Sequence, residues 1–230
     1  MASGRSSQGP GPVQEVAKGV WRLPQRGVNA YAVQAPEGTV LVDAGNPGDG
    51  RRILDALAAL GLGPPRLVLI THADVDHAGG AREIGRASGA EVLASPLEAE
   101  VLRGGGRPRL LRRLGRLMIG RLSVEAALVA GATVAGLTVL ATPGHTRGHI
   151  SLLREADGVL FAGDALAVHG EGVRIAKPPY TEDVGAACVS LGQIALRQPH
   201  LLLPGHGRPL AEPAAALARA LLDCPGGAGG

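Results

Sequence analysis

The densest functional signal in the sequence is THADVDHAGG, from Thr71 to Gly80. Within six residues it carries four side chains of the kinds that bind metal ions, namely His72, Asp74, Asp76 and His77. It directly follows RLVLI at 66–70, a continuous apolar run that is typical of a buried strand. A strand cannot direct all four side chains to one point, because its side chains alternate between two faces. We therefore expect a tight loop that opens into a helix, with Gly79 and Gly80 allowing the backbone to turn.

Three later strand-like runs end in a similar way. TVLATPGH, VLFAGD and HLLLPGH each place a ligand-type residue directly after a glycine, giving His145, Asp164 and His206. Any one of these residues alone is readily explained as a turn residue. Taken together with the first cluster they favour a metal site, because packed α/β proteins place sites at strand ends and such a burst of imidazole and carboxylate has few other uses.

The order of the elements predicts an α/β protein with helices covering two packed sheets. Short Val- and Leu-rich runs from Val13 to Gly45 predict an antiparallel meander, and a second strand block is expected at 126–154. Helical spacing is found at 50–60, 80–88 and 96–103, and again near 182–196 and 213–222. We expect a disordered lead-in at 1–12, one domain at 13–223 and a flexible tail at 224–230.

An arginine-rich segment at 103–122 stands apart from this pattern. It holds seven arginines, and five of its apolar residues fall at helical spacing: Leu110, Leu111, Leu114, Leu117 and Met118. It is interpreted as a basic amphipathic helix after a glycine hinge. Two roles stay open for it, an ordinary solvated surface helix or a cover over the active site.

The bulk composition narrows the class further. The formal charge of +3 over 230 residues is too weak to indicate nucleic-acid binding, and 2% aromatic residues offer little for base stacking. Cys188 and Cys224 lie far apart without a CxxC spacing, so we expect two incidental thiols rather than a disulfide. No run approaches the length of a membrane span or an apolar signal segment, so a cytoplasmic protein without membrane partners is expected.

With these motifs the sequence resembles the metallo-β-lactamase superfamily, whose signature is HxHxDH followed by distant GH, GD and GH elements. HADVDH at 72–77 matches the signature except that Asp74 stands where the family usually has His. VNAYAVQAPEGTVLVDAG resembles the family's opening strands, and LLLPGHGRPL its closing strand. The resemblance covers nearly the whole chain and implies a four-layer αββα sandwich of two packed mixed β-sheets flanked by helices.

The resemblance also implies a binuclear ligand set. His72, Asp74 and His145 would hold one metal ion, and Asp76, His77 and His206 the second, with Asp164 bridging both. Asp43 and His149 would orient ligands from an outer shell. Two divalent ions are expected, zinc first, with manganese or iron also accepted because Asp74 adds a negative charge and suits harder ions.

The expected activity is that of a metal-dependent hydrolase acting on a small ester, thioester or lactone. Two metal ions would lower the pKa of a shared water to about 7 and so hold it as a hydroxide. Asp76 would hold this nucleophile and then receive a proton. Antibiotic hydrolysis is not expected, because Asp164 stands where the better-known β-lactamases bridge with Cys. The alternatives are a hydrolase of phosphodiesters or phosphate-bearing substrates, a mononuclear iron dioxygenase, and an inactive metal-binding module.

The partner is expected to be a small-molecule substrate, which an arginine-rich cover would suit best if the substrate is anionic. On this view the candidate substrate contacts are Arg112, Arg113, Lys177 and Tyr180.

Overall fold

The structure is a computed structural model that describes residues 11–106 and 110–224. Most of the predicted lead-in (1–10), part of the arginine-rich segment (107–109) and most of the predicted tail (225–230) lie outside the described residues.

The first sheet confirms the predicted meander and extends it. Its strands, in spatial order, are β1 (Gln14–Ala17), β2 (Val20–Pro24), β3 (Asn29–Ala35), β4 (Gly38–Val42), β5 (Leu67–Leu69) and β6 (Glu91–Leu93). The first four pair antiparallel, whereas β4, β5 and β6 run parallel. The parallel part arises because a helix separates each strand from the next.

The second sheet is also mixed. In spatial order it contains β14 (Leu210–Ala211), β13 (Leu201–Pro204), β10 (Val159–Gly163), β9 (Ile150–Arg154), β8 (Leu137–Ala141) and β7 (Thr133–Val134). Only β10 and β13 run parallel. A separate hairpin of β11 (Ala167–His169) and β12 (Gly172–Arg174), which the sequence pattern did not predict, follows Asp164.

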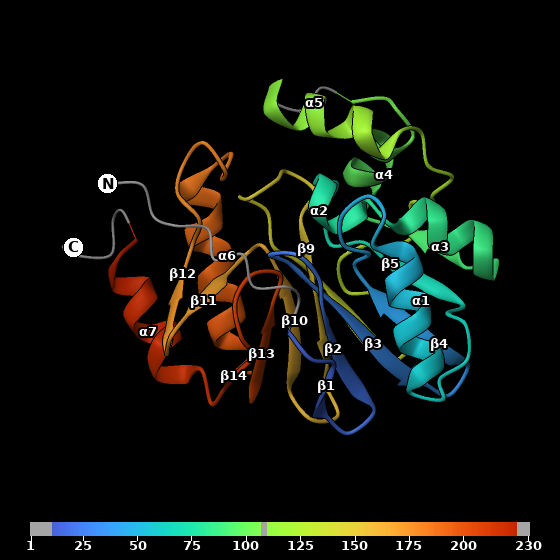
Figure 1. Ribbon diagram of the computed structural model, residues 1–230. Helices are drawn as coiled ribbons and strands as arrows, with labels where there is room; N and C mark the ends of the chain where they lie inside the picture. Colours follow the sequence, from blue (N-terminus) through green and yellow to red (C-terminus); the bar gives the residue numbers. More distant parts are fainter. Residues whose placement is uncertain (1–10, 107–109, 225–230) are drawn as a thin grey trace.

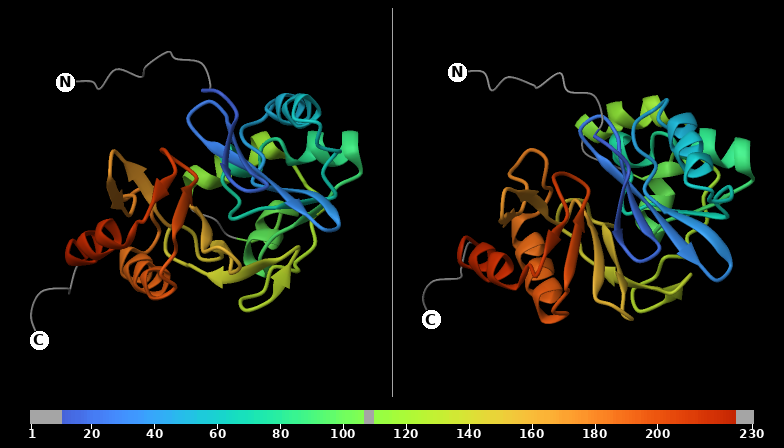
Figure 2. Two further views of the ribbon diagram at one scale, coloured as in Figure 1. Left: turned by 90° about the horizontal axis from the view of Figure 1, so that it is seen from below. Right: turned by 60° about the horizontal axis from the view of Figure 1, so that its bottom comes forward.

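Helices cover the outer faces of both sheets (Figures 1 and 2). On the first sheet these are α1 (Gly50–Ala59), α2 (Val75–Ala78), α3 (Ala81–Ser88) and α4 (Pro96–Leu102), and α5 (Leu110–Ile119) packs on α2 and α4. On the second sheet they are α6 (Val184–Leu196) and α7 (Ala214–Leu222). Within the described ranges, no helix has the length and apolar character needed to cross a bilayer.

Three hydrophobic cores lie between the two sheets and the two sets of helices that cover them. In β3, Ala30 and Ala32 pack toward the helices of the first sheet, whereas Tyr31 and Val33 face the second sheet, as the alternation of a strand requires. The rings of Tyr31 and Phe161 meet edge to face between the sheets, with centroids 5.5 Å apart. The αββα sandwich of two mixed sheets is therefore confirmed.

The expectation of two incidental thiols was wrong, because Cys188 and Cys224 form a disulfide. Cys188 lies on α6, and Cys224 follows α7, which packs beside α6 on the second sheet. This packing brings the two Cα atoms to 5.8 Å although 36 residues separate them in the chain. No spacing motif signals such a pair, since tertiary packing alone creates it.

Candidate metal centre

The structure brings all seven predicted metal ligands together at one edge of the two sheets. They come from the segments that follow β5, β8, β10 and β13. Four buried strands of two different sheets thus end at the same place, which explains why residues distant in the chain meet.

The first group consists of His72, Asp74 and His145. The Oδ2 atom of Asp74 lies 3.6 Å from Nε2 of His72 and 3.2 Å from Nε2 of His145. Burial alone would raise the pKa of Asp74, but its close contacts with His145, His72 and Arg112 outweigh burial and hold that pKa well below its usual range. Asp74 is therefore an ionised carboxylate, which a cation can use.

The second group consists of Asp76, His77 and His206, and Asp164 lies between the two groups. Asp164 Oδ2 is 3.6 Å from Nε2 of His145 and 3.2 Å from Nε2 of His206. Its other oxygen, Oδ1, is 3.2 Å from Nε2 of His77. One carboxylate thus contacts histidines of both groups.

The residues fit divalent transition-metal ions. His72 Nε2, His77 Nε2 and Asp164 Oδ1 are fully buried and make no hydrogen bond with any described residue. Buried polar atoms are normally hydrogen-bonded, so three such atoms in one cluster indicate a further ligand. Imidazole nitrogen and carboxylate oxygen are the donors that zinc, iron and manganese accept.

The electrostatics of the second group point the same way. Burial would lower the pKa of His206, but Asp164 and Asp76 raise it to about 10. Burial would raise the pKa of Asp76, but its hydrogen bond with His206 and the charge of His77 lower it to about 2. The negative charge of the carboxylates thus attracts cations, either protons on the histidines or metal ions.

Asp43 holds the imidazole of His77 in place. It follows β4 with a left-handed backbone (φ 62°), which directs its carboxylate toward His77. Its Oδ2 atom lies 2.8 Å from Nδ1 of His77, and its Oδ1 atom accepts a hydrogen bond from the Thr71 amide at 2.8 Å. This bond turns Nε2 of His77 toward Asp164.

His149 supports the centre through the backbone. Its Nε2 accepts a hydrogen bond from the Asp164 amide at 3.0 Å, and its Nδ1 lies 2.9 Å from the Thr142 hydroxyl. Burial, together with the charges of the neighbouring histidines, lowers the pKa of His149 well below its usual value. A neutral His149 therefore fixes the segment that carries Asp164.

Close packing explains why glycine precedes both Asp164 and His206. A Cβ on Gly163 would lie 2.7 Å from His149 Nε2 and 2.8 Å from Thr71 Oγ1. A Cβ on Gly205 would clash with the Asp164 carboxylate. The ligand-bearing loops approach one another too closely for any larger residue.

Glu98 on α4 also organises the centre, although sequence reasoning missed it. Its side chain is buried, with Oε2 accepting a bond from the Ala73 amide at 2.8 Å. Its Oε1 atom accepts bonds from the Thr146 hydroxyl at 2.7 Å and the Gly148 amide at 3.1 Å. One carboxylate thus joins the two loops that carry His72 and His145. In the sequence, Ser95 followed three residues later by Glu98 signals only a helix cap.

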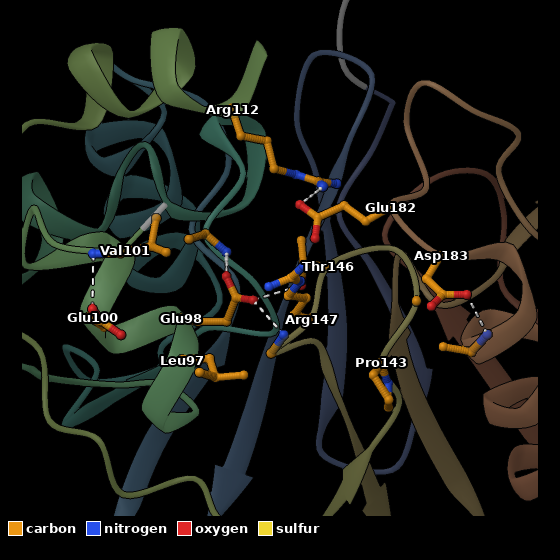
Figure 3. Close-up of a pocket in the computed structure, with 15 residues that line it drawn as sticks. Leu97, Glu98, Glu100, Val101, Arg112, Pro143, Thr146, Arg147, Glu182 and Asp183 are labelled. Carbon is orange, nitrogen blue, oxygen red and sulfur yellow. Dashed lines mark hydrogen bonds and ion pairs between the residues drawn. The ribbon is translucent and has the colours of Figure 1, made fainter. Parts of the chain in front are cut away.

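A pocket of about 650 Å³ adjoins the first ligand group (Figure 3). Leu97 and Val101 on α4 form an apolar wall, and Arg112, Arg147 and Glu182 contribute charge. Arg147 is exposed and makes no hydrogen bond or ion pair with any other residue in the described ranges. Sequence reasoning did not identify it, because arginine between two glycine turns carries no motif.

The four predicted substrate contacts are placed differently. Arg112 lines the pocket, where it contacts Asp74 and Glu182. Arg113, Lys177 and Tyr180 are exposed and do not line this pocket. Their role as substrate contacts stays a prediction.

An αββα sandwich that gathers histidines and aspartates at its strand ends is the architecture of a metal-dependent hydrolase. The comparisons with known proteins agree. Residues 23–206, which include all seven predicted ligands, match the model of the metallo-beta-lactamase superfamily. The chain belongs to this superfamily, and it is a metallo-hydrolase.

Relatives and solved structures support the assignment. The chain is 33% identical over 228 residues to the probable metallo-hydrolase YflN of Bacillus subtilis, a match that covers 85% of this chain and 86% of that protein. A hydroxyacylglutathione hydrolase of Methylobacillus flagellatus is 35% identical over 122 residues, which are 53% of this chain and 41% of that enzyme. The crystal structure of TTHA1623 in a di-iron-bound form is 29% identical, with a TM-score of 0.68 and coverage of 84% of this chain and 93% of that chain.

Proposed function

We propose that this metallo-hydrolase uses two metal ions to cleave a small ester, thioester or lactone. His72, Asp74 and His145 would hold one ion, and Asp76, His77 and His206 the other. The observation that carries the proposal is the position of Asp164, whose carboxylate contacts histidines of both groups. A thioester is also favoured by the similarity to hydroxyacylglutathione hydrolases.

The residues of the chain have separable roles in this reaction. When bound, divalent ions supply Lewis acidity, which activates water and stabilises negative charge on the substrate oxygen. Asp76 is the proposed catalytic residue, because its carboxylate is ionised and its side chain is 32% exposed toward solvent. It would orient the attacking water and take up its proton before the leaving group departs. Asp43 and His149 would hold His77 and the Asp164 segment in place.

The pocket beside the first ligand group is the proposed place for the acyl part of the substrate. Its apolar wall suits a hydrocarbon chain, while the unpaired Arg147 suits a carboxylate or another anionic group on the same molecule. Two other charged side chains at this pocket already have partners (Figure 3): Glu98 binds both ligand loops, and Asp183 caps α6 through the Ala186 amide. We therefore expect an anionic substrate.

The proposed resident metal is zinc, with iron and manganese accepted because Asp74 replaces a neutral ligand by a charged oxygen donor. The di-iron form of TTHA1623 is consistent with such a range. Asp74→His should shift selectivity toward zinc and move the acidic limb of the pH–rate profile. Metal analysis after loading from equal mixtures measures the preference, and an unchanged preference together with an unchanged limb would contradict this role for Asp74.

The activity is tested with protein stripped by a chelator and reloaded with zinc, iron or manganese. The substrates are p-nitrophenyl acetate, a glutathione thioester, a lactone and bis-p-nitrophenyl phosphate. His77→Ala should lower kcat/KM at least about 100-fold because it removes a proposed ligand, whereas His169→Ala, at an exposed position of β11, should stay within about twofold. Turnover of the phosphodiester alone would favour the phosphate-directed alternative. No turnover with any metal, or oxygen consumption with a single iron, would contradict the hydrolase proposal.

The anionic substrate is tested separately. Arg147→Gln should raise KM about 3- to 10-fold for a carboxylate-bearing ester and leave a neutral ester unchanged, because an exposed charge pair contributes modestly. Arg51→Gln, on the exposed face of α1, serves as the matched control. Equal KM values for Arg147→Gln and Arg51→Gln on the anionic ester would contradict this assignment.

A further inference from the structure

Helix α5 lies above α2 and α4 (Figure 1), and one of its faces contacts α2. Arg112, Gly115 and Ile119 share this face, because they are spaced by three and four residues. Ile119 is buried, and a Cβ on Gly115 would lie 3.5 Å from Cβ of Val75 on α2. On the other side of α5, Leu117 and Met118 are 71% and 67% exposed. Helix α5 therefore docks on the short helix that carries Asp76 and His77.

Arg112 joins three separate segments at the edge of this contact. Its Nε donates to Asp74 Oδ1 at 2.5 Å, one terminal nitrogen donates to Glu182 Oε1 at 2.6 Å, and the other donates to the Tyr180 carbonyl oxygen at 2.9 Å. Only 12% of its side chain is exposed. Figure 3 shows the guanidinium directed toward Glu182 across the top of the pocket. The three acceptors are served by three separate nitrogens of one rigid plane, whereas a lysine would offer its donors from a single nitrogen.

The two oxygens of Asp74 thus face different ways. Oδ1 is taken by Arg112, whereas Oδ2 faces the two histidines of the first ligand group at 3.2 and 3.6 Å. A carboxylate that is free to rotate can offer both oxygens to a cation. A carboxylate held at one oxygen by a guanidinium offers the other alone.

We propose that Arg112 is a positioning residue that makes Asp74 a one-oxygen ligand and fastens α5 to the metal centre. The inference rests on the proposed function only in treating Asp74 as a metal ligand. It gives the arginine-rich segment a specific role, because the helix carries the arginine that fixes a ligand. The same arginine lines the pocket, where it connects α5 with the segment that carries Glu182. Asp74 in place of the usual histidine and Arg112 above it then form one functional unit.

The first test follows the docking of α5 by hydrogen exchange of the backbone amides at 110–119. Arg112→Ala should speed their exchange about tenfold, because three hydrogen bonds, two of them to carboxylates, no longer hold the helix. Arg113→Ala removes the same charge from an exposed position of the same helix and should leave the exchange within about twofold. This measurement needs neither substrate nor turnover, so it remains informative even if the hydrolase proposal fails.

The second test reads the ligand geometry from the visible absorption spectrum of cobalt-substituted protein. Arg112→Lys keeps the charge but offers its donors from a single nitrogen in place of the separate nitrogens that bind Asp74 and Glu182, so we expect it to hold Asp74 Oδ1 less firmly and to let Asp74 chelate with both oxygens. Absorption by cobalt should weaken as its coordination number rises, while Arg113→Lys should leave the spectrum as in the wild type. Exchange in Arg112→Ala equal to that in Arg113→Ala would overturn the proposal, and so would a cobalt spectrum that Arg112→Lys leaves unchanged.

Discussion

Replacing Glu98 by Gln tests whether one carboxylate holds the two ligand loops together. The glutamine keeps the shape of the side chain and one acceptor oxygen, which can still serve Thr146 and Gly148. Its amide nitrogen would then face the Ala73 amide, so that two donors meet where a hydrogen bond existed. Turning the amide over only moves this conflict to the Gly148 amide.

The size of the effect follows from the bonds that are lost. A hydrogen bond to a charged group contributes about 1.5–3 kcal/mol, and a buried donor left without a partner is costly on the same scale. We expect Glu98→Gln to lower the free energy of unfolding by about 2–3 kcal/mol, which for a chain of this size corresponds to a fall in Tm of roughly 4–12 °C. Metal affinity should fall as well, because the loops that carry His72 and His145 lose their common anchor.

The assay is chemical and thermal unfolding of metal-stripped and metal-loaded protein. Glu100→Gln is the matched control, because Glu100 lies on the same helix but is exposed, and among the described residues its carboxylate accepts a bond from the Gly106 amide alone. The control should change Tm by less than about 2 °C. If Glu98→Gln were as stable as Glu100→Gln and bound metal equally well, the anchoring role would be refuted.

Three further predictions concern the centre and its surroundings. Asp43→Asn should weaken metal binding about 10- to 100-fold in chelator competition, because the acceptor at Nδ1 of His77 loses its charge; unchanged affinity would contradict this. In metal-stripped protein the neighbouring carboxylates raise the pKa of His77, and they raise that of His206 to about 10, so His206 is protonated at pH 7.5 and metal binding should release protons. Calorimetry in buffers of different ionisation enthalpy measures this release, and zero proton release would contradict the assignment. The raised pKa of His206 also stabilises the folded, metal-stripped protein, and this contribution to the free energy of unfolding should be present below pH 6.5 and lost as the pH rises through about 10. Replacing Cys188 and Cys224 by Ser should lower the free energy of unfolding by about 2–4 kcal/mol under oxidising conditions and change nothing under reducing ones.

That these histidines and aspartates gather at one place was predictable, because each lies next to a strong local signal. A buried apolar run followed by glycine and His or Asp identifies a strand end, and the resemblance to the superfamily assigned the partners of His72, His145, Asp164 and His206. The sandwich was equally accessible, since period-two and helical spacing alternate along the chain.

The missed features depend on contacts between segments distant in the chain. Glu98 has the sequence pattern of a helix cap, and only the packing of α4 against two loops turns its carboxylate inward. The pairing of Arg112 with Asp74 spans 38 positions in the chain, and nothing in the arginine-rich segment distinguishes Arg112 from its neighbours. The β11–β12 hairpin has strands of three residues, too short for a periodic signal.

The disulfide between Cys188 and Cys224 also makes the wall of the pocket beside the first ligand group dependent on the redox conditions around the protein. Asp183 and Ala186, at the start of α6, line that pocket, and Cys188 follows them within the first two turns of the same helix. Glutathione and thioredoxin keep cytosolic thiols reduced, whereas secreted and periplasmic proteins retain such bonds. Thiol labelling of protein taken directly from its native cell measures the oxidation state of this pair. The result therefore reports in which compartment the chain matures, and whether α6 functions with the disulfide formed or reduced.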